Sequence, residues 1–110
     1  MKEIAERAVE SFQCALLFAF EHRSALVVHG WARSDRPEGT LCFPYAWNEL
    51  DGNVYDLTQH ERPISRELFY RRHGIREDAI RKHTIQEAAC MALGTTSWGP
   101  WDRELFGQGS

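Results

Sequence analysis

The sequence has no long apolar run and no excess of basic charge. Its longest strongly apolar stretch, residues 14–20, is far shorter than the roughly 20 residues that cross a bilayer. Glutamates occupy the N-terminal segment where a signal peptide would be basic. The net charge of −3 provides no general attraction to nucleic acids or anionic lipids. We therefore expect a soluble, cytoplasmic protein without membrane contact, and nucleic acid is disfavoured as a partner.

Cysteine is scarce, with three residues in a chain of 110. An odd number without close pairing favours a reducing compartment over a disulfide framework. No two Cys or His residues have the C-x-x-C or H-x-x-x-H spacing of a metal site. The glycines are isolated, so a phosphate-binding loop is not indicated either. The sequence therefore predicts neither a metal nor a cofactor.

The composition nevertheless supports a packed core. Apolar residues make up 43% of the chain and aromatic residues 12%, which is enough to exclude a disordered chain and to build one domain over residues 1–110. Residues 2–22 have the periodicity of an amphipathic helix. Residues 24–33 alternate as a strand, and the polar residues 33–39, which include Pro and Gly, predict a loop.

The most informative segment is residues 41–58, which predicts a β-hairpin. Two apolar-alternating runs flank Asp51-Gly52, a dipeptide suited to a two-residue turn with positive φ at both positions. With that turn, residue 47 lies opposite residue 56 and residue 45 opposite residue 58. We therefore expect Tyr45, Trp47 and Asp56 to share one face of the hairpin.

The C-terminal half predicts two short helices. The first covers residues 65–73, begins at Ser65 and ends at His73-Gly74. Residues 84–87 form a capping box that begins a second helix, which we expect to stop at Gly94. Residues 75–82 are ambiguous between a strand and a helical turn, and both tryptophans of residues 97–101 are expected to pack on the body. The fold class is α+β: an N-terminal helix packed on a three- to four-stranded antiparallel meander, with two short C-terminal helices.

Several polar residues have a structural interpretation as well as a functional one. Cys14 lies in the apolar half of the first helix, where cysteine commonly packs as a small hydrophobe, and Cys42 and Cys90 also fit core positions. His29 can serve as a hydrogen-bonded structural histidine. A contact between Asp56 and the Tyr45 hydroxyl would satisfy both groups without catalysis.

A resemblance rests on the order of these residues. A helix bearing Cys14, a strand with His29, a strand YAWNEL and a partner strand VYDLT together resemble a minimal transglutaminase-like or papain-like cysteine-enzyme domain. The resemblance implies Cys14 near the place of the nucleophile, Tyr45 at the place of the histidine and Asp56 at the place of the acid. The segment TIQEAACMAL followed by WGPW also resembles small bacterial and phage proteins of similar layout.

Tyr45 departs from that family's pattern. A phenol with a reference pKa of about 10 is a poor general base near neutral pH. Either the chemistry has been lost or another histidine supplies it, and His29 is the best substitute. We favour an inactive relative that binds a protein or peptide in a groove beside Trp31, Tyr45 and Trp47.

The alternative is an active enzyme. It would be a small thiol hydrolase or acyltransferase with Cys14 as nucleophile, His29 as base and Asp56 as the residue that orients the base. Two other kinds of partner are not excluded. The basic segment at residues 71–82 could bind a phosphate group. The abundant aromatic residues could also form an exposed patch through which two copies of the chain pair as a homodimer.

Overall fold

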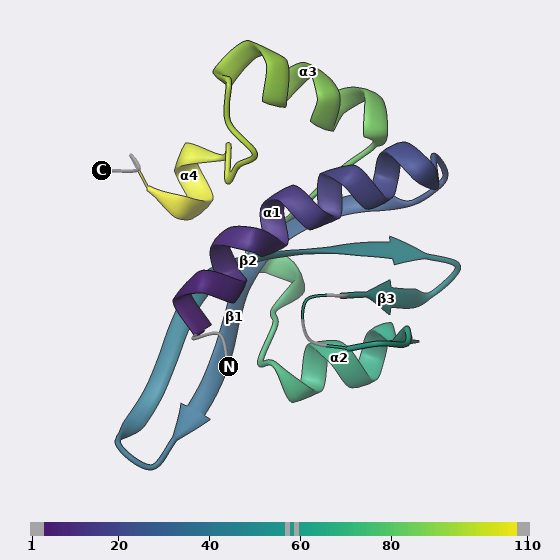
Figure 1. Cartoon of the computed structure of the whole chain (residues 1–110). Coiled ribbons are helices and arrows are strands. Elements are labelled where there is room, and N and C mark those ends of the chain that lie inside the picture. Colours follow the sequence, from purple (N-terminus) through teal and green to yellow (C-terminus); the bar gives the residue numbers. More distant parts are fainter. Residues whose placement is uncertain (1–3, 57, 59, 108–110) are drawn as a thin grey trace.

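The chain folds around a five-stranded antiparallel sheet of order β4-β3-β2-β1-β5. This is seen in a computed structural model that describes residues 4–56, 58 and 60–107 (Figure 1). The strands are β1 Leu26–Arg36, β2 Gly39–Leu50, β3 Asn53–Tyr55, β4 Ile64–Ser65 and β5 Ile80–His83. The helices are α1 Ile4–Glu21, α2 Arg66–Arg72, α3 Ile85–Thr95 and α4 Arg103–Phe106, with a 3₁₀ turn, η1, at Glu77–Ala79. The expected α+β class is confirmed, and the sheet has more strands than the sequence indicated.

The β2–β3 hairpin turns at the predicted dipeptide. Asp51 and Gly52 both have positive φ, 54° and 79°, as a two-residue turn of this kind requires. The ladder pairs Asn48 with Tyr55 and Leu50 with Asn53. The register expected from the sequence is therefore confirmed as far as residue 55, where β3 ends.

The predicted loop at residues 33–39 is wrong. β1 continues to Arg36 and β2 begins at Gly39, and the two strands stay paired down to Arg36 opposite Gly39. Gly39 has a φ of 135°, which a side chain would strain. The polar composition reflects an exposed two-stranded ribbon rather than an absence of strand structure.

Helices cover both faces of the sheet (Figure 1). On one face, α1 and α3 pack on β1 and β2 through a cluster that includes Phe12, Leu16, Val27, Ala46 and Ile85. On the other face, α2 contributes Phe69 and Tyr70 to a cluster that includes Val28, Tyr45, Trp47 and Val54. Alternation along β2 thus sends Ala46 toward α1, and Tyr45 and Trp47 toward the opposite side.

The helix-start signals in the C-terminal half are confirmed. Ser65 accepts a hydrogen bond from the backbone N–H of Leu68 at 3.2 Å, and Thr84 and Glu87 form the reciprocal capping box. The predicted stop at Gly94 is wrong, because α3 runs to Thr95 and ends at Thr96, whose φ is 53°. The ambiguous segment contains η1 and then β5, which pairs with β1.

The two C-terminal tryptophans differ in burial. Trp101 is buried, as expected, but Trp98 is 43% exposed, so the expectation that both pack on the body is wrong for Trp98. Within the described residues, no helix has the length and apolar character needed to cross a bilayer.

Candidate functional site

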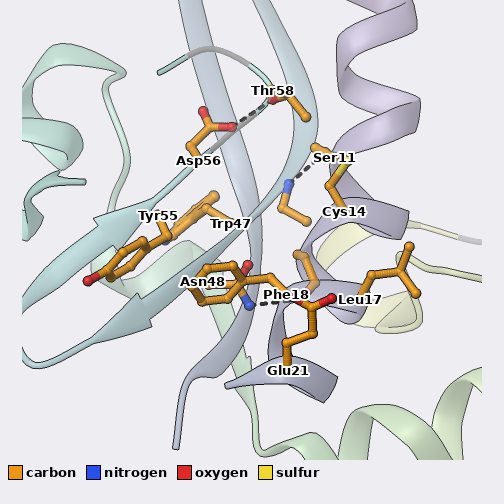
Figure 2. A pocket seen from close by; sticks show the side chains of 12 residues that line it. Ser11, Cys14, Leu17, Phe18, Glu21, Trp47, Asn48, Tyr55, Asp56 and Thr58 are labelled. Carbon is orange, nitrogen blue, oxygen red and sulfur yellow. Dashed lines mark hydrogen bonds between the residues drawn. The ribbon is translucent and has the colours of Figure 1, made fainter. Parts of the chain in front are cut away.

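A pocket of about 240 Å³ lies where α1 passes the open side of β2, just beyond the end of β3 (Figure 2). Asp56 and Thr58 lie at one end of it and Glu21 at the other (Figure 2). Its walls are Ser11, Cys14, Ala15, Leu17, Phe18, Glu21, Ala46, Trp47, Asn48, Tyr55, Asp56 and Thr58. This volume is below the roughly 300–1,000 Å³ of typical small-molecule sites, and it suits one side chain better than a whole metabolite.

Asp56 is the buried carboxylate of the pocket and is held by two hydroxyls. Tyr45 Oη donates to Asp56 at 2.9 Å from Oδ1 and 3.0 Å from Oδ2. Thr58 Oγ1 donates to Oδ1 at 2.6 Å and also contacts the Tyr45 hydroxyl. The hairpin therefore brings Tyr45 and Asp56 together, as its register predicts, and adds Thr58 to the pair.

This environment acts on the acidity of Asp56 in two directions. Burial raises the pKa of Asp56 above its ordinary value, and the hydrogen bonds from Thr58 and Tyr45 oppose part of that rise. The carboxylate is 4% exposed. No lysine or arginine among the described residues forms an ion pair with it.

Two polar residues that the sequence reasoning missed fix α1 against β2. Ser11 Oγ accepts the backbone N–H of Ala46 at 3.0 Å, and Asn48 Nδ2 donates to the carbonyl oxygen of Ala15 at 2.8 Å. Both side chains are buried. A serine within an apolar helix stripe and an asparagine within an apolar strand are the signals that could have indicated them, since buried polar side chains need partners.

Cys14 lines the pocket from α1 and is exposed. Cys42 and Cys90 are exposed as well, so the interpretation of these two as core residues is wrong. Cys42 lies in the part of β2 that extends away from the helices, and Cys90 lies on the outer side of α3.

His29 does not line the pocket. It lies on β1 and is 1% exposed, with its ring packed against Phe12 at 4.8 Å, Trp101 at 4.9 Å and His83 at 5.2 Å between ring centroids. Neither ring nitrogen has a hydrogen-bond partner among the described residues. Burial, with a smaller contribution from His83, lowers the pKa of His29 to about 3. The imidazole is therefore neutral and enclosed by aromatic rings.

The two tryptophans expected at the binding groove lie in different places. Trp47 is 1% exposed and forms part of the pocket wall, and its indole N–H donates to Glu49 at 3.0 Å. Trp31 lies farther along β1, where its indole N–H donates to the carbonyl oxygen of Leu105 at 3.0 Å and its ring packs on Phe106. Trp31 is not among the residues that line the pocket.

The described part of the chain contains no group of three or more His, Cys, Asp or Glu side chains that could hold a metal ion. Comparisons with protein-family models, with curated proteins and with solved structures find no match to this chain. The function of this protein must therefore be inferred from the chemistry of the pocket.

Proposed function

We propose that this protein is a catalytically inactive binding module that holds a peptide or protein segment in the pocket between α1 and β2. The observation that supports this most strongly is the partner of Asp56. In a cysteine enzyme the acid would orient an imidazole, whereas here Asp56 accepts hydrogen bonds from Tyr45 and Thr58. Asp56 is thus held by two hydroxyls, and not by an imidazole, beside a small pocket.

The positions of the histidines argue against the thiol hydrolase or acyltransferase alternative. Cys14 and Asp56 line the pocket, but none of the described lining residues is a histidine. His29, with its pKa lowered to about 3 by burial, is too weak a base to deprotonate a thiol efficiently. His60 does not line the pocket: its ring packs near Phe69 and His73, at 6.4 Å and 6.0 Å between ring centroids, although its charge acts on Asp56 from there.

The edge of β2 favours recognition of a side chain over the addition of a strand. Past the end of β3, alternation directs the backbone of residues 44 and 46 toward the open side of β2. Pro44 has no N–H, and the N–H of Ala46 is already bonded to Ser11. A peptide that added as a strand would find few donors there, so the pocket itself is the more favourable contact.

A pair of adjacent helix positions provides the test. Peptides selected from a random displayed library would be measured against the wild type, Cys14→Arg and Gln13→Arg by fluorescence polarisation. Cys14 lines the pocket, whereas Gln13 is exposed next to it and does not. We expect Cys14→Arg to weaken binding by about tenfold or more, because a large side chain fills the pocket, and Gln13→Arg to leave it unchanged. Equal affinities of the two variants, or failure to select any peptide, would refute the proposal.

Alkylation of Cys14 separates this proposal from the enzyme alternative. In a Cys42→Ser/Cys90→Ser background, iodoacetamide would label only Cys14. We expect slow labelling, with no change on His29→Leu. Rapid labelling at neutral pH that is lost on His29→Leu would support the enzyme.

A further inference from the structure

We infer that the pocket receives a cationic side chain, the lysine or arginine of the bound peptide. This inference rests on the proposed function and specifies its ligand. The pocket contains two carboxylates, Asp56 and Glu21, and its described lining residues include no lysine, arginine or histidine. The lining therefore carries formal negative charge that no lining cation balances.

The two carboxylates differ in a way that suits a long cationic side chain. Asp56 is buried at one end of the pocket, and Glu21 is exposed at the other (Figure 2). Asp56 Oδ2 accepts the Tyr45 hydroxyl, Oδ1 accepts the Thr58 hydroxyl, and the backbone of Thr58 adds one further hydrogen bond to the carboxylate. A carboxylate can accept about four hydrogen bonds, so one acceptor position is left for a ligand. A cation at the inner end would thus find an acceptor that is shielded from water, where a charge-assisted hydrogen bond is strongest.

Aromatic rings form the wall between these ends. Phe18 and Tyr55, which both line the pocket, lie 5.0 Å apart between ring centroids with an interplanar angle of 31°. Ring faces attract a cation and pack on the methylene groups that precede it. A neutral polar side chain would gain less from such a wall, and an anionic one would be repelled by the carboxylates.

Asn48 adds a further hydrogen-bond acceptor to the wall. Asn48 uses Nδ2 to donate to the carbonyl oxygens of Ala15 at 2.8 Å and Leu26 at 3.3 Å. Its amide oxygen is therefore the atom left to meet a ligand, and no described residue donates to it. Carboxylates, an amide oxygen and ring faces together select a donor with positive charge.

Small probes test this inference without a selected peptide. Nα-acetyl-arginine amide, Nα-acetyl-lysine amide and the neutral analogue Nα-acetyl-citrulline amide would be titrated into the wild type while the backbone amide resonances are followed by NMR. We expect saturable shifts at Cys14, Asn48 and Asp56 with the two cationic probes, and affinity for citrulline weaker by about tenfold, because a charge-assisted hydrogen bond is lost. Equal affinity for arginine and citrulline, or shifts outside the pocket, would overturn the inference.

Three variants that each remove one negative charge test which carboxylate is responsible for the preference for a cationic probe. Asp56→Asn should remove the preference for arginine over citrulline, and Glu21→Gln should reduce it. Glu38→Gln removes the same unit of charge between β1 and β2, outside the pocket, and should leave the preference intact. If both pocket variants keep the full preference for arginine over citrulline, the inference is contradicted. Because Glu21 is exposed, Glu21→Gln should fold and tests the inference even if Asp56→Asn does not fold. If selected peptides bind the pocket but lack a basic residue, the inference fails while the proposed function stands.

Discussion

Tyr45 and Asp56 are joined by a hydrogen bond of 2.9 Å across a hairpin whose backbone ladder has already ended at Tyr55. The hydrogen bond between these two side chains therefore extends the pairing of the two strands past the last backbone pair, Asn48 with Tyr55. Where β3 leaves β2, the space beside α1 opens into the pocket. Asp56, although buried, is one of the residues that line this pocket.

Tyr45→Phe tests the contribution of that hydrogen bond. Removal of the hydroxyl takes one donor from a buried carboxylate, so we expect the free energy of unfolding to fall by about 1–3 kcal/mol. The pKa of Asp56 should rise further, because the Tyr45 hydroxyl holds part of it down. Urea unfolding and the NMR titration of the Asp56 carboxyl carbon measure the two effects. The matched control is Tyr55→Phe on β3, where the ring is half-buried, and a loss of stability as large in this control would contradict the assignment.

His29 should make the fold sensitive to acid. Its pKa is lowered from 6.5 to about 3 by burial, so the unfolded chain takes up a proton before the folded one does. The contribution of His29 to the free energy of unfolding is therefore complete above pH 6.5 and is lost as the pH falls toward 3. Within that window this residue contributes a slope approaching about 1.4 kcal/mol per pH unit.

His29→Leu should therefore flatten the dependence of unfolding free energy on pH between about pH 6 and about pH 4. His73 and His83, whose pKa values are also lowered by burial, retain their share of the slope. Urea unfolding at several pH values measures this, with the exposed His22→Leu as the control for loss of an imidazole. A slope in His29→Leu as steep as in the wild type would show that the ring is not buried in its neutral form.

Glu49 is the second buried carboxylate, on the side of the sheet that faces α2. Trp47 and Tyr70 donate to its Oε2, and Arg66 and Lys82 lie 3.3 Å and 3.1 Å from its Oε1. Burial alone would raise the pKa of Glu49, but the hydrogen bonds from Tyr70, Trp47 and Lys82 hold it below its ordinary value. The carboxylate therefore ties α2 and β5 to β2.

Glu49→Gln should lower the free energy of unfolding by about 3 kcal/mol, since it leaves two cations without a buried partner. Glu77 also pairs with Arg66 but is 67% exposed, so Glu77→Gln should cost less than about 1 kcal/mol. Chemical unfolding compares the two. Equal losses would mean that Glu49 is no more important than a surface ion pair.

Two glycines offer opposite outcomes for the same substitution. A Cβ on Gly30 would lie 2.7 Å from Ile80 Cγ2 and 2.9 Å from Trp47 Cη2, whereas one on Gly94 would meet nothing within 4 Å. We expect Gly30→Ala to destabilise the protein by about 1–3 kcal/mol through overpacking. Gly94→Ala, inside α3, should stabilise it by about 0.5–1 kcal/mol. Thermal unfolding measures both, and destabilisation by Gly94→Ala would contradict the described helix.

Local signals explain what could be predicted from the sequence. The Asp51-Gly52 turn, the Ser65 cap and the Thr84 capping box depend on residues within a few positions of one another, and each is confirmed. The turn also fixes the strand register that brings Tyr45 close to Asp56. The strand β4 could not be predicted, because it consists of two residues, Ile64 and Ser65, which are too few to show the alternation of apolar and polar residues typical of a strand. They are recognised as a strand by their pairing with β3.

The environment of His29 depends on residues remote in sequence. The ring is enclosed by Phe12 from α1 and Trp101 from the C-terminal segment, and a Cβ on Gly99 would lie 2.6 Å from it. A strand pattern shows that His29 faces the same side as Val27, but it does not show which segments cover that side. The separation of His29 from the pocket of Cys14 and Asp56 could therefore emerge only from the tertiary structure.

The binding site can be located by mapping the surface that contacts a peptide selected from a random library. In a ¹H–¹⁵N titration of the wild type, we expect the largest shifts at Ser11, Cys14, Asn48 and Asp56, and their loss in Cys14→Arg but not in Gln13→Arg. The apolar groove formed by Leu16, Phe20, Leu93 and Trp98 between α1 and α3 should stay unchanged. Shifts centred on that groove, or unaffected by Cys14→Arg, would contradict the claim that the pocket beside Asp56 is the binding site.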